Sequence, residues 1–170
     1  MQPVFLKILK PLDDPNIVYN FHFYEPFVFT HQGASWIDTT MASLHDVPYP
    51  SSNGRCGKLP DFGDATANDW AGWYCTGDTW DAQHIASRIQ EAVDWAKQYG
   101  VRLTCNEFGV YPPVAPPEDR LQWFRDVHSA LEKQGIGWTV WGYDDAFGLG
   151  YSALQPMDAG VLDALGLVQQ

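Results

Sequence analysis

Four side chains that could take part in chemistry follow three separate apolar segments of the chain. His22 and Tyr24 end the run IVYNFHFY, Glu107 follows VRLTCN, and Trp141 closes WTVW. An imidazole, a phenol and a carboxylate can hold or exchange protons, and an indole can stack on a ring-shaped ligand. A carboxylate at the end of a buried strand is costly to desolvate unless a ligand or partner meets it.

Each of these residues also has a structural alternative. Glu107 could form a salt bridge with Arg102, although strict strand alternation places Arg102 on the opposite face. A lone histidine such as His22 is more often a hydrogen-bonded core residue, Tyr24 has the same ambiguity, and Trp141 could be ordinary core. Their shared position at strand ends is what favours a common site.

The apolar segments have the composition of strands. Residues 17–24, 101–105 and 138–141 are rich in β-branched and aromatic residues. In the first, alternation places Ile17, Tyr19, Phe21 and Phe23 on one face and Val18, Asn20, His22 and Tyr24 on the other. The second face becomes more polar toward its C-terminal end, as expected for a barrel strand that opens onto a site.

Helices separate these strands. One begins at Asp78 or Thr79 and runs to about Tyr99, and a second follows the proline-rich loop and runs to about Gln134. Their apolar stripes are Ile85, Ile89, Val93 and Ala96 in the first, and Leu121, Phe124, Val127 and Leu131 in the second. A short helix is expected over 161–165. Alternating strands and helices predict an α/β fold with parallel strands, whose C-terminal ends gather His22, Tyr24, Glu107 and Trp141 at one edge.

A long stretch at about 26–79 interrupts this alternation. It is crowded with Gly, Pro, Asn, Ser and aromatic residues, and we interpret it as a loop excursion on the functional face. Short helical pieces are expected within it, for example near 36–44. We treat residues 1–170 as a single domain with this excursion.

Composition limits the possible partners. The chain has 170 residues and a formal net charge of −11, which disfavours binding to nucleic acid, and its 8 tryptophans are compatible with a neutral polymer such as a polysaccharide. The alternative is that these tryptophans fill an ordinary core. No apolar run is long enough to span a membrane, and the first residues lack the pattern of a signal peptide.

The three cysteines fit no zinc pattern, and we propose no metal site and no cofactor. Cys56 and Cys75 could pair, which contributes roughly 3 kcal/mol in the loop-entropy model. Cys105 lies in an apolar strand and is expected to be a buried thiol.

Three motifs resemble glycoside hydrolase family 5, the cellulase-type family. His22-Phe23-Tyr24 matches its His-x-Tyr signature after strand six, and Asn106-Glu107-Phe108-Gly109 is similar to its nucleophile motif after strand seven. The segment from Trp138 to Tyr143, WTVWGY, is similar to its strand-eight segment. Each motif alone is weak, but three in the right order are specific. The resemblance runs from about Pro11 to Leu167.

The resemblance implies a role for each residue. Glu107 is the expected nucleophile that forms a glycosyl-enzyme, Tyr24 is expected to donate a hydrogen bond to it, and His22 is expected to line the same pocket. Trp141 is expected to stack under the sugar, and we add Trp36, from the excursion, as a second substrate-binding residue. The implied activity is retaining endo-β-1,4-glucanase hydrolysis, and the implied location of the parent enzyme is extracellular.

The chain departs from the family pattern in one respect. A retaining glycosidase needs a second carboxyl group about 5 Å from the nucleophile. The family supplies it from Asn-Glu-Pro after strand four, and this motif is missing from the sequence. Glu25 is rejected as a substitute because alternation turns it away from Tyr24, and Asp144 and Asp145 are possible without further support.

We therefore expect a partial (β/α)8 TIM barrel made of strands six to eight, a truncated fragment with weak or no hydrolysis by itself. Its open edges are expected to self-associate or to pair with a complementing barrel fragment. The alternative functions are a non-catalytic carbohydrate-binding piece and an assembly module that completes a barrel with another chain. The polysaccharide itself is not determined by the sequence.

Overall fold

The computed structural model describes residues 2–51, 54–143, 147, 149 and 157–167. Along the chain its elements are α1 (Pro3–Leu6), β1 (Val18–Phe23), α2 (Phe27–Thr30), α3 (Thr39–Ser43), a 3-10 turn (Arg55–Lys58), α4 (Ala65–Thr76), α5 (Ala82–Tyr99), β2 (Arg102–Phe108), α6 (Pro117–Lys133), β3 (Gly137–Trp138) and α7 (Ala159–Ala164).

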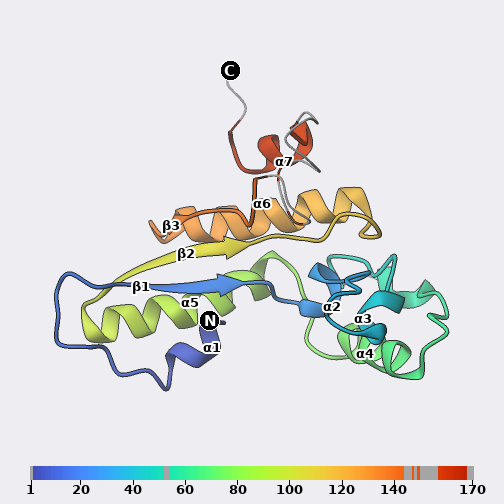
Figure 1. The fold of residues 1–170 in the computed structure, drawn as a ribbon, viewed down its shortest axis with the longest axis horizontal. Coiled ribbons are helices and arrows are strands. Elements are labelled where there is room, and N and C mark those ends of the chain that lie inside the picture. Colours follow the sequence, from blue (N-terminus) through green and yellow to red (C-terminus); the bar gives the residue numbers. More distant parts are fainter. Residues whose placement is uncertain (1, 52–53, 144–146, 148, 150–156, 168–170) are drawn as a thin grey trace.

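The three strands form one parallel sheet in the order β1-β2-β3 (Figure 1). This confirms the expected α/β architecture with an unclosed sheet. The third strand is shorter than the predicted 138–141. Its backbone nevertheless stays bonded to β2 beyond Trp138, because the amides of Thr139 and Trp141 donate to the carbonyls of Cys105 and Phe108 at 3.0 Å each.

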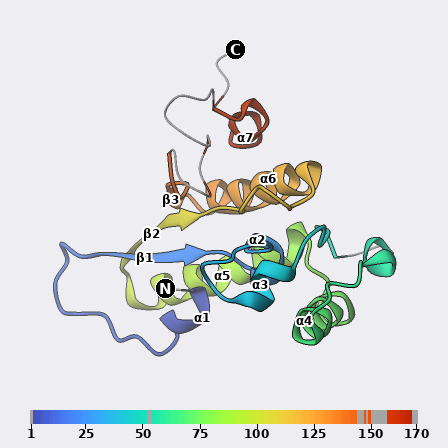
Figure 2. The same cartoon turned by 45° about the vertical axis from the view of Figure 1, so that its right-hand side comes forward.

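One face of the sheet is covered by helices. α1, α5, α6 and α7 contact one another in that order, and Figures 1 and 2 show the long helices α5 and α6 running beside the strands. Phe21, Phe23, Cys105 and Phe108 point into this layer and are fully buried. The alternation predicted for the first strand is therefore correct, with Phe21 and Phe23 in the core and Asn20 and His22 on the other face.

The helix α5 begins two or three residues later than predicted. Asp81, rather than Asp78 or Thr79, is its N-cap, with the carboxylate accepting from the amide of His84 at 2.9 Å. Gly100 ends the helix in the left-handed conformation with φ 63°, which glycine adopts without steric penalty. The predicted stripe of Ile85, Ile89, Val93 and Ala96 is buried against the sheet.

The helix α6 matches its prediction closely. Pro117 occupies the first turn, where a missing N–H costs nothing, and Glu118 and Asp119 face the positive end of the helix dipole. Phe124, Val127 and Leu131 of the predicted stripe are buried, while Leu121 is half-buried. The short C-terminal helix expected over 161–165 is α7.

The excursion at residues 26–79 contains more regular structure than predicted. It holds α2, α3, the 3-10 turn and α4, of which only the region of α3 was expected. It also has a hydrophobic cluster of its own, centred on Met41, Leu44, Val47 and Tyr74. Cys56 and Cys75 form a disulfide across this cluster, as the sequence allowed. Figure 2 shows α3 and α4 together beyond the end of β1.

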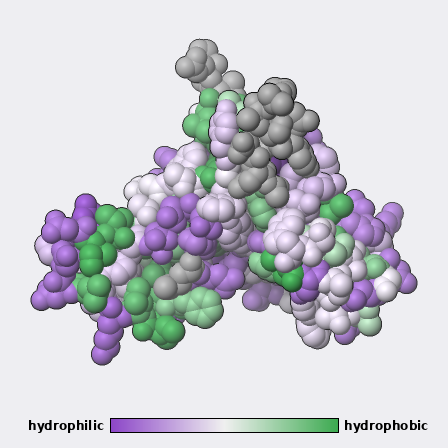
Figure 3. Space-filling view, in the orientation of Figure 1, coloured by the Kyte–Doolittle hydropathy of each residue, from purple (hydrophilic) through white to green (hydrophobic). Residues whose placement is uncertain are grey.

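The sheet's second face and its β1 edge are open. Val18, Asn20, Asn106 and Thr139 are exposed on this face. Further apolar side chains are exposed on the N-terminal segment, at Phe5, Ile8 and Leu12, and Figure 3 shows hydrophobic surface on that side of the molecule. Within the described segments, none of the helices has the length and apolarity needed to cross a membrane.

Candidate active site

A one-residue irregularity in strand pairing decides where Glu107 points. Phe21 pairs with Cys105 but His22 pairs with Glu107, so Asn106 is an extra residue in β2, a β-bulge. If Asn106 took part in a regular alternation and formed no bulge, the alternation from the buried Cys105 would turn Glu107 toward the helices. With the bulge, Asn106 and Glu107 both lie on the open face and Phe108 returns to the core. The bulge therefore places the carboxylate beside His22.

The bulge also corrects the reasoning about Arg102. Arg102 pairs with Val18 and lies on the open face, the same face as Glu107, and not the opposite one. It still does not serve Glu107, because it lies near the other end of the strand and donates to the carbonyl of Pro15 at 3.2 Å. The salt-bridge alternative for Glu107 therefore fails because of distance along the strand.

The Glu107 carboxylate is held by two side chains from β1 and its end. His22 Nδ1 lies 3.0 Å from Glu107 Oε2, and the Tyr24 hydroxyl donates to the same oxygen at 3.4 Å. Both donors come from one strand and approach from the same side. The structure thus brings together His22, Tyr24 and Glu107, three of the residues that the sequence singled out.

The state of His22 follows from its surroundings. Burial lowers the pKa of His22 below its ordinary value of 6.5, and the negative charge of Glu107 opposes that shift. A neutral imidazole with its proton on Nδ1 donates to the carboxylate and adds no positive charge. The two side chains that hold the Glu107 carboxylate are therefore neutral donors.

An aromatic wall extends from Tyr24 into the excursion. The Tyr24 ring meets His31 at 5.2 Å and Phe147 at 5.7 Å between centroids, and Phe147 in turn meets Trp36 at 5.9 Å. Tyr111 packs edge-on against Trp36 at 4.6 Å. Trp36 is 51% exposed, so one side of its ring remains available beside Tyr24. We name this group of Tyr24, His31, Trp36, Tyr111 and Phe147 the aromatic wall.

Three members of the aromatic wall, His31, Tyr111 and Phe147, were not predicted. His31 is buried, its Nδ1 lies 2.9 Å from the Thr30 hydroxyl, and burial lowers its pKa to about 4. The sequence signal that could have found it is the histidine itself, seven residues after Tyr24 in an aromatic-rich loop. Tyr111 and Phe147 had no signal beyond their residue type.

Trp141 lies at the end of the third strand. Its side chain is 46% exposed, and its carbonyl oxygen approaches Gly109 so closely that a Cβ built there would lie 3.0 Å from it. Phe147 would lie 3.3 Å from the same Cβ. Glycine fits position 109, after Asn-Glu-Phe, because a side chain there would force the Trp141 backbone and the Phe147 ring to shift by a few tenths of an ångström.

Glu25 lies away from this group, as expected. Its two carboxylate oxygens accept from Arg88 on α5 at 2.6 and 3.0 Å, and its carbonyl accepts from the Trp123 indole at 3.0 Å. It is therefore committed to the helix side of β1. Asp144 and Asp145, the other candidates for a second carboxylate, lie outside the described residues.

Other reactive groups do not contribute to this site. Burial raises the pKa of the Cys105 thiol to about 12, so it is an unreactive core residue, as predicted. Among the described residues, no cluster of His, Cys, Asp and Glu has an arrangement that could hold a metal ion. What the site offers is one oriented carboxylate with two donors on it, and the exposed rings of Trp36 in the aromatic wall and of Trp141 after the third strand.

Comparison with known proteins places this geometry in a family context. The family model described as cellulase (glycosyl hydrolase family 5) matches residues 2–147. The chain is 34% identical over 144 residues to Endoglucanase 3 of Fibrobacter succinogenes, covering 81% of this chain and 21% of that protein. It is 35% identical over 138 residues to Endoglucanase C of Acetivibrio thermocellus, covering 81% of this chain and 39% of that protein.

Solved structures agree with the fold. One endoglucanase superposes with a TM-score of 0.73 at 25% identity, over 97% of this chain and 44% of that one. A hyperthermophilic endo-β-1,4-glucanase, solved in complex with substrate, superposes with a TM-score of 0.72 at 28% identity, over the same shares of 97% and 44%. The chain therefore spans less than half the length of the relatives to which it is similar.

Proposed function

The chain belongs to the cellulase family, glycosyl hydrolase family 5, and from that premise we propose that it carries the nucleophile side of a retaining endo-β-1,4-glucanase active site. The observation that supports the proposal most is the Glu107 carboxylate, held through Oε2 by His22 at 3.0 Å and Tyr24 at 3.4 Å at the C-terminal ends of parallel strands. We treat residues 1–170 as one partial barrel domain.

In the proposed reaction Oε1 of Glu107 attacks the anomeric carbon while the two donors stay on Oε2. The bond from that carbon to the leaving-group oxygen breaks, and a glycosyl ester forms on Glu107. As the Glu107 carboxylate loses negative charge during the attack, Tyr24 and His22 keep the carboxylate oriented. Their hydrogen bonds also determine how strongly its charge is stabilised before the attack. Trp141 and Trp36 are the proposed stacking surfaces for sugar rings on either side.

Both halves of the reaction need a second carboxyl group, which protonates the leaving group in the first half and activates water in the second. Asn-Glu-Pro does not occur in the sequence, and Glu25 is bonded to Arg88 on the other side of β1. We therefore propose that the isolated chain hydrolyses glucan weakly or not at all, because acid–base catalysis contributes about 10²–10⁴-fold.

The nucleophile can be tested without the missing acid. A 2-deoxy-2-fluoro-β-cellobioside with a dinitrophenolate leaving group needs no protonation of that group, so attack by Glu107 alone should give a stable ester. Mass spectrometry of the peptides should place the cellobiosyl adduct on Glu107. Glu107→Gln should give none, and Tyr24→Phe should change the rate of labelling while leaving its position unchanged. Labelling on another carboxylate, or none at any concentration, would contradict the proposal.

The open face and the β1 edge support a second proposal, that the chain pairs with another barrel fragment or with a second copy. Phe5, Ile8 and Leu12 of the N-terminal segment and Val18 of β1 are exposed apolar residues. Figure 3 shows hydrophobic surface on the side of the molecule where the N-terminal segment lies. Burying these residues is favourable by about 25 cal/mol per Å². Light scattering should give a mass above that of one chain, and a sharp monomeric mass would contradict self-association.

We also propose an extracellular location, because a polymeric glucan is met outside the cell. The proposed substrate is the support for this location.

A further inference from the structure

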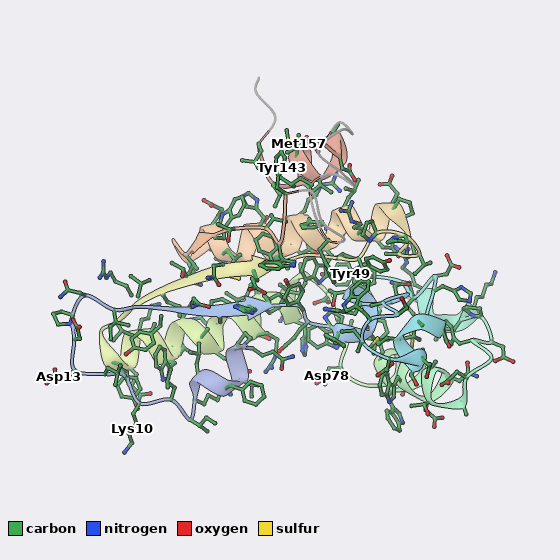
Figure 4. All side chains as sticks on the ribbon, viewed as in Figure 1. Lys10, Asp13, Tyr49, Asp78, Tyr143 and Met157 are labelled. Carbon is green, nitrogen blue, oxygen red and sulfur yellow. A yellow bond between two sulfur atoms is a disulfide. The ribbon has the colours of Figure 1, made fainter. Side chains whose placement is uncertain are left out.

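A hollow of about 710 Å³ lies on the other side of β1 from Glu107, between α4 and the first turns of α5. Its volume falls in the range of roughly 300–1,000 Å³ that is usual for small-ligand sites. Trp70, Trp73 and Trp80 line it, together with Asp78, Arg88 and Glu91. Figure 4 labels Asp78 in this region, between the long helix α5 and the helices of the excursion.

The three indoles are an unusual concentration of aromatic surface for one hollow. Trp73 is 67% exposed, while Trp70 and Trp80 are half-buried and pack against the excursion's hydrophobic cluster. Trp70 and Trp73 are three residues apart on α4 and so share one face of that helix. Because the fold does not bury Trp73, the stability of the protein does not explain so large an apolar side chain at this position. Binding of a flat or ring-shaped ligand does explain it.

The charged groups of the hollow indicate a neutral ligand. Arg88 donates to Glu25 at 2.6 Å and to Glu91 at 2.7 Å, and Lys7 pairs with the other oxygen of Glu91 at 2.8 Å, so these two cations and two carboxylates balance one another. The exposed carboxylate of Asp78 adds a negative charge at the rim. A phosphate or a carboxylate therefore finds no unbalanced cation among these groups, while the carboxylate of Asp78 can accept hydrogen bonds from hydroxyl groups.

The hollow is separate from the proposed active site. Tyr24 and Glu25 are neighbours in sequence, and alternation sends them to opposite sides of the chain. Tyr24 reaches Glu107, whereas Glu25 reaches Arg88 inside the lining of the hollow. A ligand against Trp73 therefore does not touch the carboxylate of Glu107.

We infer that this hollow is a second, non-catalytic binding site for a neutral pyranose chain, with Trp73 as the main stacking surface and Asp78 as an acceptor for sugar hydroxyls. The choice of a β-glucan as ligand rests on the proposed function, but binding at this site needs no turnover. A chain held here would keep the polymer near the face that carries Glu107.

Affinity electrophoresis of the full chain through native gels that contain soluble mixed-linkage β-glucan tests this directly. The measurement is made in a Trp36→Ala Trp141→Ala background, which removes the proposed stacking contacts of the active site. In that background Trp73→Ala should raise the apparent dissociation constant about 2- to 12-fold, the factor that corresponds to one aromatic contact. Tyr99→Ala, an exposed aromatic at the far end of α5, should leave it unchanged.

The outcomes separate this inference from the proposed function. Equal retardation of the Trp73→Ala and parent chains, or no retardation of the parent, would overturn the second site even if Glu107 is labelled by the fluoro-cellobioside. Retardation that depends on Trp73 would support it even if no labelling occurs. Because Trp73 is largely exposed, the melting temperature of Trp73→Ala should match that of the parent, which verifies that folding is intact.

Discussion

The sheet with its helix layer and the excursion at residues 26–79 are stabilised in different ways. The first buries a continuous set of large side chains, including Phe21, Phe108, Trp123 and Phe124, between strands and helices. The second has a smaller cluster and relies more on a disulfide and on buried polar groups. Gln32, for example, is fully buried and bonds the carbonyls of Phe29 and Val47 and the amide of Val47.

The two regions therefore contribute different residues to the proposed site and hold them in different ways. The sheet fixes Glu107 and His22 through backbone pairing, so their geometry is tied to the global fold. The excursion contributes His31 and Trp36 from a segment whose order depends on a few local bonds. We expect changes in the sheet to act globally and changes in the excursion to act locally, and each of the following predictions tests that contrast.

The largest effect is expected in the sheet layer. Phe108→Ala removes a fully buried ring from the centre of the core and should lower the free energy of unfolding by about 3–5 kcal/mol. Urea unfolding followed by circular dichroism measures the change. Tyr99→Ala, at an exposed position at the end of α5, is the matched control and should stay within about 0.5 kcal/mol. A loss below about 1 kcal/mol at Phe108 would mean that the layer is loosely packed.

Loss of the disulfide should act on the excursion alone. Replacing Cys56 and Cys75 together with serine should lower the stability of that segment by about 3 kcal/mol, because the bridge no longer restricts its unfolded state. Hydrogen exchange should show lost protection in α4 with unchanged protection in α5 and α6. A reducing agent should reproduce this in the parent chain and change nothing further in the double variant. Loss of protection in α6 as well would contradict the division.

Acid should destabilise the molecule through His31. Burial lowers the folded-state pKa of His31 to about 4, while the unfolded chain binds the proton near 6.5. Stability is therefore complete above pH 6.5 and is lost as pH falls toward 4, by at most about 1.4 kcal/mol per pH unit and roughly 2–3 kcal/mol in total. His31→Gln should flatten this part of the pH profile in thermal melts. An unchanged slope in the variant would assign the acid sensitivity to other groups.

The smallest effects are expected at two helix caps. Asp81 caps α5 and Asp64 caps α4, each through a bond from its carboxylate to the amide three residues later. Replacement of either by alanine should cost about 1 kcal/mol, and replacement by asparagine much less. Asp81→Ala should shift the global unfolding transition, whereas Asp64→Ala should alter exchange only within the excursion. Identical signatures for the two variants would show that both regions unfold as one unit.

Much of the sheet layer could be predicted from the sequence, and the excursion could not. β-branched and aromatic runs marked the strands, and stripes such as Ile85, Ile89 and Val93 marked the long helices. The helix α4 gave no such signal because it buries Ala67, Ala71 and Tyr74, a set of mostly small residues with little apolar contrast. The bridge between Cys56 and Cys75 could be suggested from the sequence, but the hydrophobic cluster beside it brings together residues such as Met41 and Tyr74 whose spacing follows no single periodic pattern.

The residues of the candidate site could be predicted from the sequence better than their arrangement. Parallel topology correctly brought His22, Tyr24 and Glu107 to one edge of the sheet. The face on which Glu107 lies depends on the extra residue Asn106, and a pattern of alternating residues carries no mark of such an irregularity. For the same reason, strict alternation placed Arg102 on the wrong face of the sheet.

That extra residue adds a position to β2 without changing the partners of its neighbours. Removing Asn106 would give an uninterrupted alternation after Cys105, with Glu107 still opposite His22 and Phe108 still opposite Phe23. Flattening the bulge with Asn106 retained would instead turn Glu107 toward Phe23, Trp123 and Phe124 and would bring Phe108 to the open face. What the additional position contributes is therefore a second exposed side chain, that of Asn106, directly before the carboxylate.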